Sequence, residues 1–210
     1  RSLAVSDGWH FNPQDRVLAS QKFSNGDIEH LCGVVNIFVR SIPRLVLFSR
    51  LMQRGYSGGQ KGKVTPGKQA SALARMITLN VPNEKEAGLR TWLLYSDIKK
   101  TMGTKNVTSM FRLLSPYPGY MASVWMDTKK MIQQPTFRRA KEEVSRRSLG
   151  LIAGMPVGDH RRHAKNLSPD QWRDLEEMTD SCVRVMPQMA LIAAVWQRSF
   201  PQSGSGMIAA

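Results

Sequence analysis

The feature that most constrains this chain is an internal duplication. The segment SNGDIEHLCGVVNIFVRSIPRLVLFSRLMQRGY, from Ser24, aligns with SPDQWRDLEEMTDSCVRVMPQMALIAAVWQRSF, from Ser168, at one offset of 144 residues. Upstream, RSL at 1–3 aligns with RSL at 147–149 at an offset of 146. Self-similarity on this scale predicts two copies of one structural unit. The identities at the first offset include Leu31 with Leu175, Pro43 with Pro187, Leu47 with Leu191, and Gln53-Arg54 with Gln197-Arg198.

The two copies have different lengths. The second copy extends upstream from about residue 83 to residue 146, and the first copy has no counterpart of that part after Arg1. We expect the counterpart to have been removed, left unresolved or supplied by another chain. The predicted organisation is the C-terminal half of a first repeat at 1–56, a basic Gly/Lys/Pro linker at 57–82, a complete second repeat at 83–202 and a tail at 203–210.

The charge of the chain is strongly positive. Thirty Lys and Arg against 16 Asp and Glu give a net charge of +14, which predicts polyanionic or acidic neighbours. Because no uninterrupted run of about 18 apolar residues occurs, we expect no transmembrane segment. Cys32 and Cys182 both lie in apolar helical patterns, which indicates reduced, buried thiols.

The hydrophobic pattern predicts an all-α, multi-helix fold, because no segment alternates with a period of two. Ser24 followed by Asp27 is a helix-capping pair, and Ser168 with Gln171 repeats it. We expect Pro43 and Pro187 to interrupt their helices at equivalent places.

Four further helices are expected in the second repeat, before the segment that aligns from Ser168. One runs over 84–102, capped by Asn83 and stopped by Gly103, with Leu89, Trp92, Leu93 and Ile98 facing inward. The others are a short helix at 107–114, a helix at 120–133 that ends before Pro135, and a basic helix at 136–151.

Three segments of this sequence resemble a known family. They are YSDIKKTMGTKNVTSMFRLLSPYPGYMASVWMDTKKM at 95–131, SIPRLVLF at 41–48 and MPQMALIA at 186–193. They are similar to the group I 2-haloacid dehalogenases, and the resemblance covers most of the chain. It implies two tandem all-helical repeats that pack as a pseudo-dimer. It also implies hydrolysis of a carbon–halogen bond, in which an Asp activates a water that attacks the carbon directly.

The resemblance also indicates a damaged catalytic site. Aligned on Pro118, the family's Ser-Asp pair falls on Ser109-Met110, so the serine remains and the base does not. A thioether cannot take a proton from water at neutral pH. The stretch that corresponds to the family's water-positioning amide, 39–42, contains no Asn. The nearest carboxylate upstream is Asp97, which is the candidate base if the chain is nevertheless an active enzyme.

Basic side chains gather in the region of 138–165, and they are the predicted contacts for a polyanion or a protein partner. The alternative interpretation is a solvated helix with internal ion pairs, such as Arg139 with Glu143. His160 and His163 supply at most two ligands beside arginines, so no metal site is expected. The predicted contact residues are Arg138, Arg139, Lys141, Arg146, Arg147, Arg161, Arg162 and Lys165.

These observations favour a non-catalytic accessory or scaffold subunit of a larger assembly, with other subunits covering the incomplete first repeat. We expect a mitochondrial assembly, ribosomal or respiratory, from the basic charge; a cytoplasmic location is the alternative. No cofactor is expected. Two other functions remain open: an active 2-haloacid dehalogenase, and a protein that binds the RNA backbone or anionic lipid headgroups.

Overall fold

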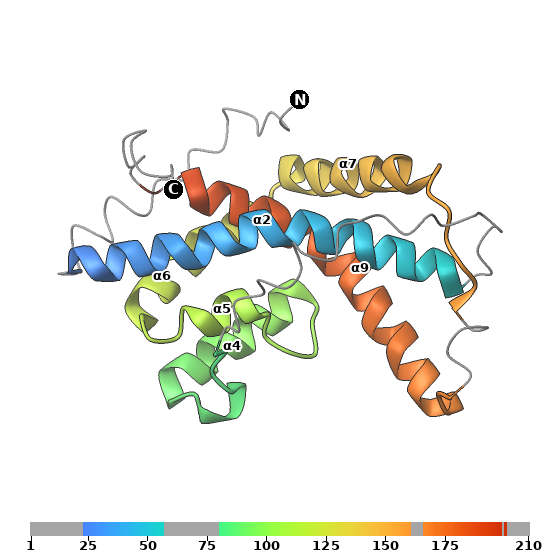
Figure 1. Ribbon diagram of the computed structural model, residues 1–210. Helices are drawn as coiled ribbons and strands as arrows, with labels where there is room; N and C mark the ends of the chain where they lie inside the picture. Colours follow the sequence, from blue (N-terminus) through green and yellow to red (C-terminus); the bar gives the residue numbers. More distant parts are fainter. Residues whose placement is uncertain (1–22, 57–79, 161–165, 199, 201–210) are drawn as a thin grey trace, which may run out of the picture.

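The computed structural model describes residues 23–56, 80–160, 166–198 and 200. In these ranges all regular structure is helical, as predicted. Two long helices, α2 (Asn25–Tyr56) and α9 (Pro169–Arg198), cross and make the most extensive helix–helix contact. Below α2 in Figure 1 lie α4 (Leu89–Met102), α5 (Ser109–Leu113) and α6 (Pro118–Gln133), and α7 (Pro135–Ile152) lies above it.

The duplication is visible in the hydrogen bonds of the two long helices. At the start of α2, the Asp27 amide donates to Ser24 Oγ (3.2 Å); at the start of α9, the Gln171 amide donates to Ser168 Oγ (3.3 Å). In return, the Ser24 amide donates to Asp27 Oδ2 at 2.9 Å, and the Ser168 amide donates to Gln171 Oε1 at 2.8 Å. The same local sequence pattern therefore starts the same helix twice.

A second pair of equivalent hydrogen bonds joins the long helices to each other. Gln53 Nε2 donates to Asp180 Oδ1 at 2.9 Å, and Gln197 Nε2 donates to Asn36 Oδ1 at 2.8 Å. Each residue of the first bond lies 144 positions from its counterpart in the second. The α2–α9 crossing therefore has an approximate two-fold symmetry, in which each helix repeats the role of the other.

The predicted interruptions at Pro43 and Pro187 are wrong, because both prolines lie inside continuous helices. Proline removes one helical hydrogen bond, but here the extensive contact between α2 and α9 outweighs that loss. The first expected helix is also shorter than predicted. Its capped start at Asn83 leads only into a 3-10 turn, η1 (Glu84–Glu86), and α4 begins at Leu89.

The core lies where α5, α6 and the C-terminal half of α9 meet. Phe111 packs edge-to-face on both Trp125 and Trp196, with ring centroids 5.4 and 5.6 Å apart. The Trp196 indole also donates to Thr128 Oγ1 at 2.8 Å inside this core. Buried aromatic pairs of this geometry stabilise beyond the burial of their area.

The predicted inward face of α4 is only partly correct. Ile98 is buried, but Leu89, Trp92 and Leu93 are 73%, 51% and 55% exposed. Tyr95 and Met102 pack inward with Ile98, so the buried stripe is displaced from the one that the apolar residues alone indicate.

Helix α2 is also long and apolar enough to cross a membrane, as judged by length and composition alone, with a mean hydropathy of 1.7 over its most apolar window. Arg40 and Arg44 interrupt the apolar residues of α2, so the sequence contains no unbroken apolar run of that length here. The mean hydropathy of the helix is nevertheless high, because most of the other residues in this stretch are apolar. Helices that pack in the core of a soluble protein meet the same criterion.

Candidate functional site

A pocket of about 420 Å³ lies between the α4–α5 loop and the N-terminal half of α9; we call it the α9 pocket. The loop begins at Gly103, whose φ of 66° gives α4 a left-handed end that other residues rarely adopt. Glu84 then holds the loop, because its carboxylate accepts from the Val107 amide at 3.0 Å. The loop therefore presents 104–109 to α9 in a fixed conformation.

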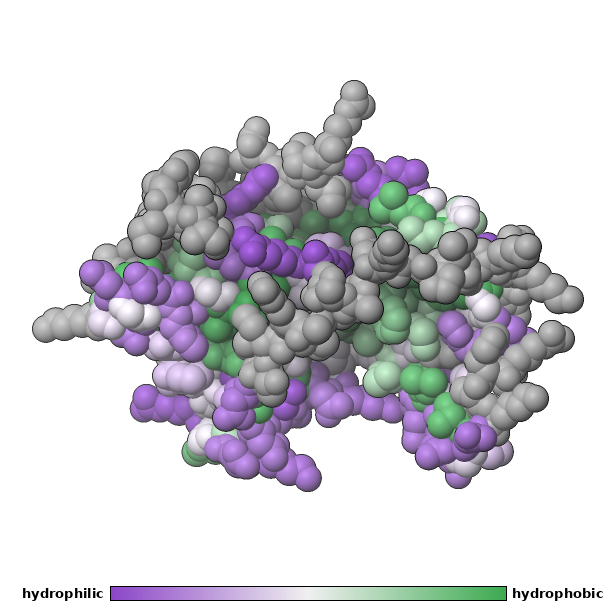
Figure 2. Space-filling view, viewed as in Figure 1, coloured by the Kyte–Doolittle hydropathy of each residue, from purple (hydrophilic) through white to green (hydrophobic). Residues whose placement is uncertain are grey.

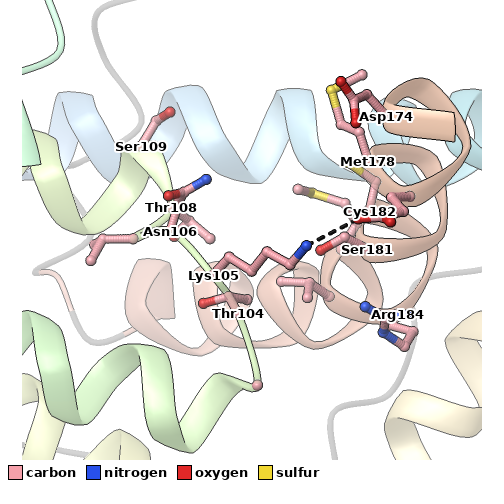
Figure 3. A pocket seen from close by; sticks show the side chains of 15 residues that line it. Thr104, Lys105, Asn106, Thr108, Ser109, Asp174, Met178, Ser181, Cys182 and Arg184 are labelled. Atoms are coloured by element: carbon pink, nitrogen blue, oxygen red, sulfur yellow. Dashed lines mark hydrogen bonds and ion pairs between the residues drawn. The ribbon is translucent and has the colours of Figure 1, made fainter. Parts of the chain in front are cut away.

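The chemistry of the α9 pocket is mainly that of exposed polar groups. Its two carboxylates, Asp174 and Glu177, come from α9, and Figure 3 shows Asp174 beside Met178 on that helix. Lys105 Nζ binds Glu177 at 3.0 Å, and this hydrogen bond lowers the pKa of the Glu177 carboxyl. The two side chains are 89% and 58% exposed, so the pocket opens to solvent here. An exposed carboxylate with a lowered pKa is a weak general base.

The α9 pocket also holds a cysteine. Burial raises the pKa of Cys182, so its sulfur is a neutral thiol at neutral pH. Neutral thiols are poor nucleophiles, and the side chain is therefore part of the apolar wall with Met178 and Met186.

The structure separates Ser109 from Met110. Ser109 lies at the first turn of α5 and lines the α9 pocket, on the far side from Asp174 in Figure 3. Met110 is 0% exposed and belongs to the hydrophobic core. The side chain that the sequence predicted to align with the family's base is thus apolar and packs in the core.

Asp97, the alternative base, is occupied elsewhere. Its carboxylate accepts from Lys129 Nζ at 2.7 Å and from the Trp125 indole at 2.8 Å. These two hydrogen bonds lower the pKa of Asp97. Asp97 does not line the α9 pocket, and its contacts tie α4 to α6. This geometry gives it a structural role.

A second hollow, of about 610 Å³, is an apolar groove between α2, α7 and α9. Val39, Leu47, Val144 and Leu191 are among its apolar lining residues, and Arg147 also lines it. The groove contains no Asp or Glu among its lining residues, so it offers no acid or base.

The basic residues of α7 are partly neutralised. Arg146 and Arg147 both donate to Glu143, and these bonds lower the pKa of Glu143 to about 2. The expected Arg139–Glu143 pair is therefore replaced by pairs further along the helix. Arg138 and Arg139 are exposed and Lys141 is half-buried. Arg161, Arg162 and Lys165 lie outside the described residues, so the predicted basic face is tested only in part.

In the described part of the chain, no three His, Cys, Asp or Glu side chains lie close enough together to hold a metal ion. Sequence reasoning missed Asp174, Glu177 and Met178 as pocket residues. They approach the loop only through the tertiary contact of two segments about 70 residues apart, and no spacing in the sequence reports that contact.

Comparisons with known proteins agree with this architecture. A family model described as "Halocarboxylic acid dehydrogenase DehI" matches residues 11–111. The (R)-2-haloacid dehalogenase of Pseudomonas putida is 22% identical over 146 residues, which are 67% of this chain and 48% of that enzyme. The chain therefore spans about half the length of this curated relative.

Two solved structures share the fold. A D-2-haloacid dehalogenase mutant superposes with a TM-score of 0.73 at 19% identity, over 90% of this chain and 68% of that one. A complex of such a mutant with D-2-CPA gives 0.68 at 20% identity, over 92% and 68%. The fold and its duplication thus define an all-helical tandem-repeat protein. In sequence the chain is similar to haloacid dehalogenases, and it shares the fold of the solved D-2-haloacid dehalogenase structures.

Proposed function

We propose that this chain is a non-catalytic helical subunit, descended from a haloacid dehalogenase-like fold, that serves as an accessory or scaffold in a larger assembly. The observation that carries the proposal is Met110. Its side chain is 0% exposed in the core, at the position where the family's Ser-Asp pair would place the water-activating carboxylate. A side chain without a basic atom, shielded from water, cannot activate a water molecule.

The surface of the chain supports a role in an assembly. Large apolar side chains on α2 and α9 are exposed, including Phe48 and Met178 at 58% each. Exposed apolar surface of this kind marks protein contacts when its members lie together. The net charge of +14 favours acidic or polyanionic neighbours, and a mitochondrial ribosomal or respiratory assembly is the setting we propose.

The purified chain tests this proposal directly. A subunit with uncovered apolar surface is expected to self-associate, or to need a partner to remain soluble, as seen in sedimentation velocity. A monodisperse monomer across the micromolar range, with no tendency to bind another protein, is inconsistent with the accessory role.

The second candidate function is hydrolysis of a 2-haloacid. It is favoured by the relatives' activities and by two carboxylates, Asp174 and Glu177, on the wall of the α9 pocket opposite Ser109. Halide release from 2-chloropropionate tests it. Activity lost in Asp174→Asn or Asp97→Asn, with the fold retained, would establish the enzyme and end the accessory proposal.

The third candidate is binding of an RNA backbone or anionic lipid headgroups by α7, favoured by the exposed guanidinium groups of Arg138 and Arg139. Phosphate binding of this kind weakens steeply with salt. A binding constant for single-stranded RNA or for anionic vesicles that does not change between low and physiological salt excludes it.

A further inference from the structure

Three sulfur-containing side chains line the α9 pocket, and all three come from one face of α9. Met178, Cys182 and Met186 are spaced four residues apart, so they lie on successive turns of the helix. Side chains at this spacing have Cβ atoms about 5–6 Å apart. Figure 3 shows Met178 and Cys182 together on the α9 side of the pocket. We call these three residues the sulfur row.

The sulfur row is accessible from solvent, unlike the next methionine along the helix. Met178 is 58% exposed, and Cys182 and Met186 are half-buried. Met189, by contrast, is 2% exposed, and its sulfur accepts a hydrogen bond from the Thr108 hydroxyl at 3.8 Å. In Figure 2 the surface is hollowed between α4 and the N-terminal half of α9, and hydrophobic residues lie beside the hollow. An ion in solution can therefore reach the sulfur row without any opening of the core.

The side chains of the sulfur row can converge on one ion. Cys182 is the central member, one turn from each methionine. A methionine side chain is unbranched and has three rotatable bonds, so its sulfur adapts its position to a neighbour. The exposed Met178 has room to rotate toward Cys182, and Met186 reaches it from the following turn. Three sulfur ligands centred on Cys182 are therefore compatible with this helix face.

The chemistry of the sulfur row selects the kind of ion. Thiolate and thioether sulfurs are soft ligands, which suit copper(I). Calcium and magnesium need several oxygen ligands, but the Glu177 carboxylate in this pocket is already bound to Lys105. A structural zinc site needs four ligands from Cys, His or carboxylate side chains, and among the residues with described positions no three of these come together.

The charge of the α9 pocket favours a monovalent ion. Its lining contains two carboxylates, Asp174 and Glu177, and two cationic side chains, Lys105 and Arg184, so the formal charges balance. Exchange of the Cys182 thiol proton for one copper(I) ion leaves that balance unchanged, because each carries a single positive charge. A divalent ion would add positive charge to a chain that already carries +14.

We propose that Met178, Cys182 and Met186 form a binding site for a soft monovalent metal ion, of which copper(I) is the biologically common example. A copper–sulfur bond forms to Cys182 as the thiol proton leaves to solvent, and each thioether donates a lone pair. Copper enters and leaves as copper(I), so the step needs no oxidant or reductant. The site goes beyond the proposed accessory function and does not depend on it.

Competition with the thiol proton makes the binding depend on pH. Burial raises the pKa of Cys182, so the thiol is protonated throughout pH 6–8. Because one proton leaves for each ion bound, the apparent affinity should rise about tenfold per pH unit in this range. The other ionisable groups of the pocket are Asp174, Glu177 and Arg184 on α9 and Lys105 on the loop. None of them is a histidine, the side chain that ordinarily titrates in this range.

A competition titration of the purified full chain tests the proposal. Copper(I) is supplied without oxygen, and a coloured copper(I) chelator competes with the protein for it. One ion per chain is expected, and Cys182→Ser should weaken the binding at least tenfold. Cys32→Ser is the matched control and should leave the affinity unchanged. Cys32 is also a half-buried free cysteine, but it lies on α2 and is not among the residues that line the α9 pocket.

The methionines distinguish a three-sulfur site from a single reactive thiol. The double variant Met178→Leu/Met186→Leu keeps the apolar wall of the pocket and should weaken copper(I) binding at least tenfold. Met126→Leu is its control and should change nothing, because Met126 is 63% exposed on α6 and does not line the pocket. X-ray absorption of the copper-loaded chain should show sulfur neighbours only.

The proposal is overturned by unchanged affinity in Cys182→Ser or in the methionine double variant, or by equally tight binding of zinc(II). An affinity that does not change between pH 6 and pH 8 also overturns it, and this measurement needs no variant. Far-ultraviolet circular dichroism of each variant separates a loss of binding from a loss of folding. Halide release does not enter these measurements, so their result is independent of the proposed function.

Discussion

The inequality between equivalent positions predicts very different stability costs for equivalent mutations. Ile192 and Phe48 occupy the same place in the two repeats, but one is 0% and the other 58% exposed. Truncation of Ile192 to Ala leaves a cavity in the core and should cost about 3 kcal/mol, within the usual range of 2–5. Phe48→Ala removes a side chain that is already more than half in water and leaves no closed cavity. Full burial of a Phe is worth roughly 1.5–3 kcal/mol, so its cost should be about 1 kcal/mol or less.

The assay is thermal or urea unfolding of the isolated chain, followed by circular dichroism. For a chain of this size, 1 kcal/mol corresponds to about 2–4 °C in Tm. Ile192→Ala should therefore lower Tm by roughly 6–12 °C, and Phe48→Ala by no more than about 4 °C. Equal losses in the two variants would mean that Phe48 is covered within the isolated chain. The difference in burial between these two equivalent positions would then be refuted.

Three further outcomes follow from individual contacts. Because hydrogen bonds from Lys129 and from an indole lower the pKa of Asp97, its charged form stabilises the fold above about pH 4 and loses that contribution as pH falls below 3.8. Since Asp97 is 38% exposed, Asp97→Asn should cost only about 0.5–1 kcal/mol at pH 7 and flatten the acid side of the stability profile. Met110→Asp should cost several kcal/mol, as it buries an unpaired charge, and should not create halide release; a stable variant that releases halide contradicts the burial of this position in the core. Trp196→Phe loses the 2.8 Å bond to Thr128 and should cost about 1–2 kcal/mol in urea unfolding, whereas an unchanged midpoint would show that this bond contributes nothing.

Much of the fold could be predicted from the sequence, because its strongest signals are local. Ser24 with Asp27 and Ser168 with Gln171 form the expected caps, since these contacts join residues three positions apart. Gly103 ends α4 for an equally local reason. The continuity of α2 through Pro43 could not be predicted in this way, because it depends on packing against α9.

The site could be predicted less well than the fold. The resemblance identified Ser109 and Met110, and the structure adds that only the first reaches a pocket. The exposure of Trp92 was missed because helical spacing shows that apolar residues share a face but not whether another element covers it. The same limitation hid the exposure of Phe48, which continues an apolar stripe that is buried in the N-terminal half of α2.

Halide release by the purified chain tests the central claim most directly, because the claim is that the chain lacks a water-activating base. Both enantiomers of 2-chloropropionate are incubated with the purified protein, and chloride is measured against a sample without protein. The proposed absence of a base at Met110 predicts no chloride above that background at any pH from 6 to 10. Chloride release that saturates with substrate and disappears in Asp174→Asn or Asp97→Asn would show that the chain is an enzyme.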